Sequence, residues 1–350
     1  MNPSTPAPKA SDKLKSIKRQ ALSLRGESLV ATSVMDETRQ LPLVLEARVA
    51  GLRLSEWATA QRTLLDEYLR RHGAILFRGF EVGGAEGFEG AVKATSGAEE
   101  LLAYEYRSSP RTQVSGRIYT STDYPPEHSI FLHNENSYQT TWPMKVYFYC
   151  AEAAREGGET PIADSRRIYA RISPPVRARF AEKKWMYMRN FGDGFGLPWQ
   201  SVFQTTEREV VEAQCRRNGI EFEWKKNNGL RTRAIRPAIH RHPYTGEMVW
   251  FNHATFFHVT TLEPSVREML RKEFAEDELP TNTFYGDGSP IEDEVLEELR
   301  EIYRSEEVVF SWQEGDMLML DNMLVAHGRR PFSGERKILV GLAEPFREEA

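Results

Sequence analysis

The sequence has little cysteine, with only Cys150 and Cys215 among 350 residues. Two cysteines cannot build a disulfide framework or a cysteine-rich metal site, and so few of them fits a reducing cytoplasm. Long apolar runs are also missing: no stretch approaches the roughly 20 residues of a membrane span, and the first residues lack the apolar segment of a secretory signal. We therefore expect a cytoplasmic protein that does not enter a membrane.

A strong excess of charge of one sign is likewise missing. The 46 basic and 51 acidic residues give a formal net charge of −5, which provides no overall attraction for nucleic acid or for anionic lipid. Nucleic acid is therefore not an expected partner. What the chain does have is 40% hydrophobic and 11% aromatic residues, enough for a sizeable core and a buried pocket. Nothing in the sequence specifies an oligomeric state.

The chain divides into a short tail and one long domain. Residues 1–25 contain three prolines and six basic side chains against a single acid, a composition typical of a flexible basic tail. An organelle transit peptide is the alternative. We expect residues 26–350 to form a single catalytic domain.

Three helices are marked by their ends and their apolar stripes. One is expected from Ser55, as its cap, to the residue before Gly73. A second begins near Pro264, and a third begins at Ser289, where Glu292 would complete a capping box. We expect helical inserts at about residues 195–236 and 262–304.

The remaining regular structure is β-like. Six segments are short, rich in aromatic and β-branched residues, and bounded by Gly, Pro or Asp: Lys145–Cys150, Trp185–Phe191, Met248–Ala254, Glu307–Trp312, Met317–Leu320 and Lys337–Leu342. The Glu314-Gly315 pair suggests a hairpin between two of them. The expected fold is mainly β with α (α+β): a two-sheet antiparallel barrel with helices packed outside.

A candidate metal site begins with the His133-Asn134-Glu135 tripeptide. On a strand, residues two apart project to the same face, so the imidazole and the carboxylate can reach one ion. The best third ligand is His327, which follows the expected hairpin. Two histidines and one carboxylate leave three coordination positions open, the arrangement of non-haem Fe(II) oxygenases. Alone, a His-x-Glu tripeptide is weak evidence, since a lone histidine is more often structural.

Other residues allow two alternative interpretations of the protein's function. His240, His242 and Glu247 form the ligand set of an alternative metal enzyme of the cupin kind, which would need no cosubstrate, although Pro243 and the turn that follows favour a hairpin end. A non-catalytic metal-binding barrel is the second alternative.

Several motifs together resemble the taurine dioxygenase and clavaminate synthase-like superfamily, especially members that act on amino acids in nonribosomal peptide natural-product pathways. The motifs are the His133-x-Glu135 pair, the Gly157–Pro161 segment (GGETP), Gly315-Asp316 leading to Asp321-Asn322 and His327, and Arg336 at the last strand. The resemblance extends over about residues 40–344. It implies a double-stranded β-helix (jelly-roll) core.

The resemblance also implies the cofactors and the reaction. His133, Glu135 and His327 would hold Fe(II), while Thr160 and Arg336 would bind the distal carboxylate of 2-oxoglutarate, a role that suits the two-pronged guanidinium. The enzyme would couple the decarboxylation of 2-oxoglutarate with O2 to the hydroxylation of an unactivated carbon. Desaturation or ring closure by the same chemistry is the alternative.

Two positions differ from the pattern of many relatives. Glu135 stands where many have aspartate, although the clavaminate synthase-like branch also uses glutamate; because halogenating relatives have a small residue here, Glu135 favours hydroxylation. Val340 stands where some relatives place a second arginine, so that recognition of 2-oxoglutarate would rest more heavily on Arg336 and Thr160.

The residues that contact the substrate are less clearly indicated by the sequence. Polar and aromatic residues near the expected barrel mouth are candidate substrate contacts: Tyr138, Arg189, Asn190, Trp199, Asn252 and His253. Filling of the core is the alternative for the aromatic residues, and a turn or a surface pair is the alternative for Arg189 and Asn190. Four arginines form a local basic cluster: Arg231, Arg233, Arg236 and Arg241. Such clusters are mostly solvated faces, but this one could dock an acidic carrier protein that presents a tethered amino acid. The expected partner is therefore a small-molecule or carrier-tethered amino acid.

Overall fold

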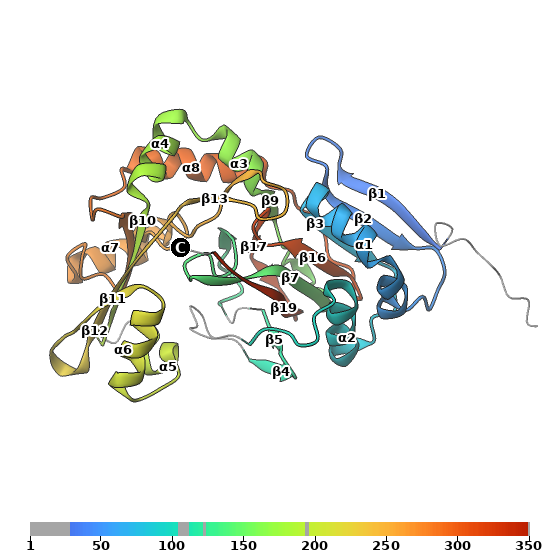
Figure 1. The fold of residues 1–350 in the computed structure, drawn as a ribbon, viewed down its shortest axis with the longest axis horizontal. Helices are drawn as coiled ribbons and strands as arrows, with labels where there is room; N and C mark the ends of the chain where they lie inside the picture. Colours follow the sequence, from blue (N-terminus) through green and yellow to red (C-terminus); the bar gives the residue numbers. More distant parts are fainter. Residues whose placement is uncertain (1–28, 104–111, 122–123, 193–195, 349–350) are drawn as a thin grey trace, which may run out of the picture.

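The computed structural model describes residues 29–103, 112–121, 124–192 and 196–348, so the tail expected at residues 1–25 lies outside the described residues. The largest sheet has the strand order β1-β2-β3-β16-β7-β19-β5-β4 and runs through the centre of the molecule (Figure 1). Its strands are β1 (Val30–Asp36), β2 (Leu41–Ala47), β3 (Ala74–Arg78), β4 (Gln113–Ser115), β5 (Ile118–Thr120), β7 (Thr141–Glu152), β16 (Met317–Asp321) and β19 (Lys337–Arg347). Only the β2–β3 pair is parallel among the pairings of this sheet.

The central strands of this sheet are apolar on both faces. In β16, Leu318 and Leu320 point into one buried cluster, whereas Met317 and Met319 point into another. This alternation follows from the two-residue period of a strand. A strand that is covered on both sides must be apolar at nearly every position, which explains why these segments read as short continuous apolar runs.

Two helices cover one face of the sheet. Helices α1 (Leu54–His72) and α2 (Gly84–Ser96) supply the buried side chains Leu65, Leu69 and Phe88 to the cluster on that face. As expected, α1 ends at Gly73, whose φ of 73° lies in the left-handed region that glycine adopts without strain. The expected cap was wrong: the residue before α1 is Arg53, its side chain makes no capping hydrogen bond, and Ser55 already lies inside the helix.

A second layer of short strands faces the other side of the sheet. It consists of β6 (Ile130–His133), β17 (Val325–Arg329) and β9 (Ile162–Asp164) in the order β6-β17-β9, with the pairs β8 (Glu156–Gly157)-β18 (Phe332–Ser333) and β13 (Ile239–Arg241)-β14 (Met248–Trp250). Phe148, Leu318 and Val325 fill the space between the layers. This two-layer core carries the candidate site on its inner side.

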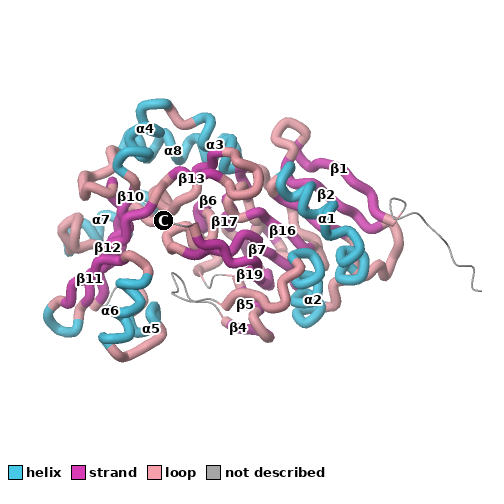
Figure 2. The backbone as a smooth tube through the Cα atoms, in the orientation of Figure 1, coloured by secondary structure: helices cyan, strands magenta, loops and turns pink. Residues whose placement is uncertain are grey.

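A third region, with a sheet and helices of its own, lies beside the two-layer core (Figure 2). It contains a sheet in the order β11-β12-β10-β15, made of β10 (Trp185–Phe191), β11 (Ile220–Trp224), β12 (Leu230–Arg236) and β15 (Thr281–Tyr285). Its helices are α3 (Ser165–Arg171), α4 (Pro174–Lys183), α5 (Trp199–Phe203), α6 (Arg208–Arg217), α7 (Pro264–Glu273) and α8 (Asp293–Glu306), with 3-10 turns at Lys226–Asn228 and Val259–Thr261. The expected helical inserts are therefore mixed, since β11, β12 and β15 lie within them.

Local signals misled three further expectations. Glu307–Trp312 is not a strand, because only Val308 forms an isolated bridge, to Ile162; the expected hairpin is therefore absent, and β16 pairs with β3 and β7 instead. The Met248–Ala254 strand ends at Trp250. Helix α8 begins after Glu292 without a capping box. None of the helices that the structure describes is both long and apolar enough to cross a membrane.

Candidate active site

Two histidines face each other across neighbouring strands. His133 ends β6 and His327 lies in β17, and the two are directly paired in the antiparallel register. Their ring centroids are 4.6 Å apart. Glu135 follows the end of β6, and its Oε2 lies 3.9 Å from Nε2 of His327. One ligand atom from each of the three side chains lies within 4.8 Å of the other two, the only such group that could hold a metal ion among the described residues.

The orientation of His133 suits metal binding. Its Nδ1 lies 2.9 Å from the backbone oxygen of Phe131, so this nitrogen carries the proton and donates to the carbonyl. The Nε2 lone pair is then available for a metal, as in most histidine ligands, whose second nitrogen is fixed by such a contact. Phe256 and Phe148 pack against the rings of His133 and His327 respectively.

An asparagine holds the segment that carries Glu135. The fully buried Asn322 accepts a hydrogen bond from the Glu135 N–H at 2.7 Å and donates to the backbone oxygens of Glu135 at 2.8 Å and Pro143 at 2.9 Å. Asn134 donates in return to the Asn322 carbonyl at 2.7 Å. The carboxylate ligand is thus tied to the turn that leads into β17 and His327.

The rival ligand set does not assemble. His242 contacts Asp321 through Nε2 at 3.0 Å, while His240 pairs with Glu348 and Glu247 pairs with Arg166. Each of the three has a different partner, and they form no group of metal-ligating atoms among the described residues. Asp321 also accepts hydrogen bonds from the backbone N–H groups of Met323 and Leu324, so it supports the turn at residues 322–324.

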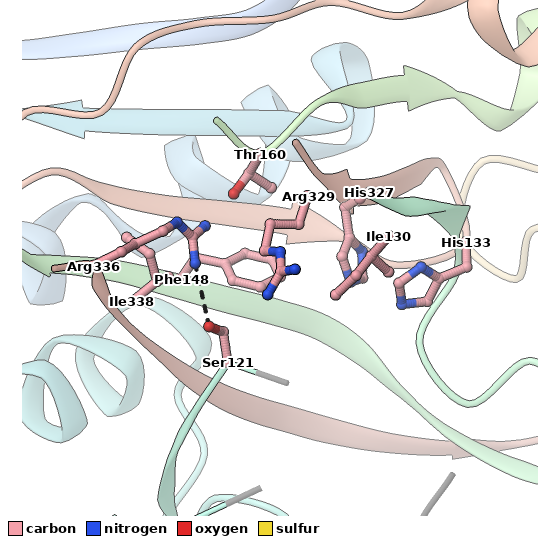
Figure 3. A pocket seen from close by; sticks show the side chains of 10 residues that line it. Ser121, Ile130, His133, Phe148, Thr160, His327, Arg329, Arg336 and Ile338 are labelled. Atoms are coloured by element: carbon pink, nitrogen blue, oxygen red, sulfur yellow. Dashed lines mark hydrogen bonds between the residues drawn. The ribbon is translucent and has the colours of Figure 1, made fainter. Parts of the chain in front are cut away.

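A small cavity runs from the two histidines towards Arg336 (Figure 3). Thr160 and Arg336 both line it, as the resemblance implied. The Thr160 hydroxyl oxygen accepts a hydrogen bond from the Trp312 indole at 3.1 Å, which leaves the hydroxyl proton available for a ligand. Arg336 donates to the Gly158 carbonyl at 2.9 Å and to Ser121 Oγ at 3.3 Å.

The glycines of the Gly157–Pro161 segment make room for this arginine. A Cβ on Gly158 would lie 2.9 Å from Cδ of Arg336, and one on Gly157 would lie 2.2 Å from the Pro331 carbonyl oxygen. Both glycines also have positive φ, where a side chain is strained. Burial, followed by the charge of Arg329, lowers the pKa of Arg336 to about 10. A bound anion would counter both effects.

Sequence reasoning missed several residues of this cavity: Ser121, Ile130, Phe148, Arg329 and Ile338. Arg329 follows His327 by two positions on the same strand, a spacing from which it could have been found. Ile130 lies on the strand of His133 and Ile338 lies two positions after Arg336, whereas Ser121 and Phe148 come from other segments of the chain. Val340, in place of the second arginine of some relatives, is fully buried in the apolar core.

Two substrate-side candidates lie beside the histidine pair. The His253 ring is 5.4 Å from that of His133 and 5.1 Å from that of Tyr138, and its Nδ1 lies 2.6 Å from Ser137 Oγ. Burial, followed by the nearby His133, lowers the pKa of His253 well below its usual value. His253 is therefore neutral at physiological pH and offers one donor and one acceptor.

An aromatic row leads away from His253 towards a third candidate. Phe257 stacks on His253 at 4.7 Å and on Tyr187 at 4.4 Å, and neither aromatic was predicted. Tyr187, Arg189 and Phe191 share one face of β10, and the Arg189 guanidinium lies over the rings of its two neighbours. The row thus joins the candidate metal site to the buried cation of Arg189.

The other three candidates have structural contacts. Asn190 donates to the carbonyls of Asp277 and Leu279, Asn252 bridges Ala238 and Ala254, and Trp199 donates to the Asn228 carbonyl within a separate core cluster. For Asn190 and Trp199, these contacts match the turn and core roles that were their alternatives.

The arginine cluster does not form one exposed patch. Arg231 is buried and bonded to Asn190 and the Asp277 carbonyl. Arg236 is also buried and donates to the Asn218 carbonyl after α6 at 2.7 Å. Only Arg233 and Arg241 reach the surface, so local spacing in the sequence overstated the cluster.

With this geometry in place, the chain can be compared with known proteins. The family model described as taurine catabolism dioxygenase TauD, TfdA family, matches residues 37–343. The chain belongs to this family. It is 43% identical over 281 residues to the dapdiamide synthesis protein DdaC of Enterobacter agglomerans, covering 80% of this chain and 85% of that protein. It is 33% identical over 326 residues to a clavaminate synthase-like protein of Arabidopsis thaliana, covering 88% and 95%.

Solved structures confirm the fold. PvcB of Pseudomonas aeruginosa matches with a TM-score of 0.54 at 17% identity over 91% of this chain and 93% of that one. A taurine dioxygenase of Burkholderia xenovorans matches with a TM-score of 0.51 at 16% identity over 90% and 89%. The core is thus the expected double-stranded β-helix. As a member of the TauD/TfdA family, the protein is an Fe(II)- and 2-oxoglutarate-dependent oxygenase that uses O2.

Proposed function

We propose that this dioxygenase hydroxylates an unactivated C–H bond of an amino acid or aminoacyl compound in natural-product biosynthesis. His133, Glu135 and His327 hold the iron, and Thr160 and Arg336 bind the distal carboxylate of 2-oxoglutarate. The observation that carries the proposal is the direct pairing of His133 with His327 beside Glu135, at one end of a cavity that reaches Arg336. Similarity to the dapdiamide synthesis protein supports the substrate class.

Each side chain has a defined task in this proposal. His133, Glu135 and His327 would hold the metal and would leave coordination positions for the keto acid and O2. When bound, iron and 2-oxoglutarate supply the oxidising chemistry that removes hydrogen from the substrate. Glu135 fills the position that a halide would need, which favours hydroxylation. Desaturation or ring closure is the alternative outcome of the same chemistry.

The substrate lies, in this proposal, along the aromatic row. Tyr138 and the neutral His253 contact it near the iron, and Arg189 binds its carboxylate at the far end, because a guanidinium is suited to a carboxylate. The substrate is either free or tethered to a carrier protein. A cytoplasmic location is part of the proposal and is supported by the two cysteines, both buried and free.

One experiment tests the reaction class and the substrate together. The enzyme with Fe(II), 2-oxoglutarate and O2 is offered a panel of free amino acids and the same residues on a carrier protein, and the products are weighed by mass spectrometry. We expect a gain of one oxygen with matching succinate formation, and a loss of two hydrogens would indicate desaturation. Release of succinate that no amino compound stimulates, free or tethered, would contradict the substrate class.

The role of Arg189 has its own test. Arg189→Met should raise KM for the amino acid while leaving the affinity for 2-oxoglutarate unchanged. Arg233→Met is the matched control, since Arg233 lies on the same sheet but on its other face and is part-exposed. Equal KM values for the two variants would remove Arg189 from the substrate site.

A further inference from the structure

The 2-oxoglutarate cavity contains a second guanidinium that the resemblance did not imply. Arg329 and Arg336 both line it, and both contact the ring of Phe332, at 5.2 and 5.4 Å from its centroid. In Figure 3 the Arg329 guanidinium lies between Arg336 and the two histidines. No aspartate or glutamate is among the lining residues that the structure describes.

Among the described residues, the guanidinium of Arg329 forms hydrogen bonds only with neutral groups. Its guanidinium donates to the backbone oxygens of Tyr124 at 2.9 Å, Pro125 at 2.6 Å and His128 at 2.8 Å. Its Nε is buried and has no hydrogen-bond partner among the described residues, and the residue is only 5% exposed. The charge is thus buried against three carbonyls, and no carboxylate of the described residues forms a salt bridge with it; the exposed Glu127 acts on it only through space.

Such a pair of cations needs an anion. Burying one unpaired charge is costly, and two like charges in one cavity repel. A ligand with a carboxylate at this end of the cavity would offset both costs. Since Val340 leaves the family's second arginine position apolar, the cavity has its second cation on a different strand.

We propose that Arg329 is a second cosubstrate-binding residue, which recognises the distal carboxylate of 2-oxoglutarate together with Arg336. The inference rests on the proposed site for 2-oxoglutarate and deepens it. It explains why a neutral core residue is tolerated at Val340. It also makes the cavity selective for dicarboxylic keto acids, because a keto acid with an apolar tail would leave both guanidiniums uncompensated.

The test is an equilibrium binding measurement without turnover. Wild-type enzyme, Arg329→Met and Arg329→Lys are loaded with Fe(II) under anaerobic conditions and titrated with 2-oxoglutarate, following the visible absorption band of the bidentate keto-acid complex. The same titrations use 2-oxopentanoate, which has the same chain length but no distal carboxylate. We expect Arg329→Met to raise the Kd for 2-oxoglutarate about ten-fold or more, as for loss of a hydrogen bond to a charged group.

The Kd for 2-oxopentanoate should change little in the same variant. Arg330→Met is the matched control: Arg330 is the next residue, is paired with Glu307 at 3.0 Å and has a half-exposed side chain, so both Kd values should equal those of the wild type. Arg329→Lys keeps the charge without the planar guanidinium. Its Kd for 2-oxoglutarate should lie between those of the wild type and Arg329→Met, and this variant provides the test if the methionine variant does not fold.

Three results separate the possibilities. A rise in Kd for 2-oxoglutarate alone supports the inference. Equal rises for both keto acids, or no rise for either, overturn it, since Arg329 would then act only through the 124–128 segment or not at all. Failure of the wild-type enzyme to form the complex with 2-oxoglutarate would contradict the proposed cosubstrate site itself.

Discussion

Asn322 should control iron affinity although it is not one of the three ligands. Its side chain makes three hydrogen bonds, two of them to the backbone of Glu135. Asn322→Ala removes all three and leaves buried backbone groups unsatisfied. At roughly 1 kcal/mol for each bond, we expect the free energy of unfolding to fall by about 3 kcal/mol. Because outer contacts of metal ligands are typically worth 10- to 100-fold in affinity, we expect Fe(II) binding to weaken by about that factor.

Two measurements distinguish an effect on the position of Glu135 from an effect on the stability of the protein. Fe(II) affinity is measured by competition with a chelator, and stability by urea unfolding. Asn190→Ala is the matched control, because Asn190 is also buried and donates to two backbone carbonyls, those of Asp277 and Leu279, but its hydrogen bonds do not involve the three proposed metal ligands. We expect both variants to lose stability and only Asn322→Ala to lose iron affinity. Equal iron affinity in the two variants would refute the positioning role of Asn322.

Three further outcomes follow from the structure. Trp312→Phe keeps an aromatic ring but removes the hydrogen bond to Thr160. In steady-state kinetics, KM for 2-oxoglutarate should rise several-fold while kcat changes little. An unchanged KM would contradict this prediction. Burial lowers the pKa of His258 to about 4, against about 6.5 when unfolded. The contribution of neutral His258 to the free energy of unfolding is therefore present above pH 6.5 and is lost as pH falls from 6.5 to 4. His258→Gln should flatten that part of the pH profile of unfolding free energy, and an equally steep profile would count against this account. Burial raises the pKa of the Cys150 and Cys215 thiols to about 12, so a thiol reagent at neutral pH should label neither until urea unfolds the chain; rapid labelling of the native protein would contradict their burial.

The sequence allowed the metal ligands to be proposed because strand geometry makes them local. His133 and Glu135 are two apart, and a strand would place such residues on one face, although β6 ends at His133 and Glu135 lies in the turn that follows. The third proposed ligand, His327, was chosen because it follows the expected hairpin; that hairpin is absent, but His327 does follow strand β16. The pairing of His327 with His133 is a long-range contact between strands, which the local sequence pattern only suggested.

Contacts made by distant segments could not be predicted. Asn322 was noticed as part of a motif, but its bonds to Glu135 join residues 187 positions apart. Tyr187 and Phe257 form the aromatic row because β10 and the loop after β14 meet in space. The Glu307–Trp312 segment resembled a strand because of its apolar residues. Val308, Phe310 and Trp312 pack into the core, but only Val308 pairs, through an isolated bridge to Ile162.

Charge patterns were similarly ambiguous. Arg231 and Arg236 looked like parts of a basic surface, yet both are buried and satisfy backbone carbonyls. Arg329, in contrast, drew no attention and lies in the cavity. An arginine's sequence neighbours do not specify whether it faces solvent, carbonyls or a ligand, because that depends on which segments pack around it.

The most direct test of the central claim is a crystal structure of the enzyme with Mn(II), which does not turn over, and 2-oxoglutarate, with the metal located by its anomalous scattering. We predict a single metal peak within bonding distance of Nε2 of His133, a carboxylate oxygen of Glu135 and Nε2 of His327, with the keto acid extending from it to Arg336. A metal held by other residues, or a keto acid bound away from Arg336, would contradict the account.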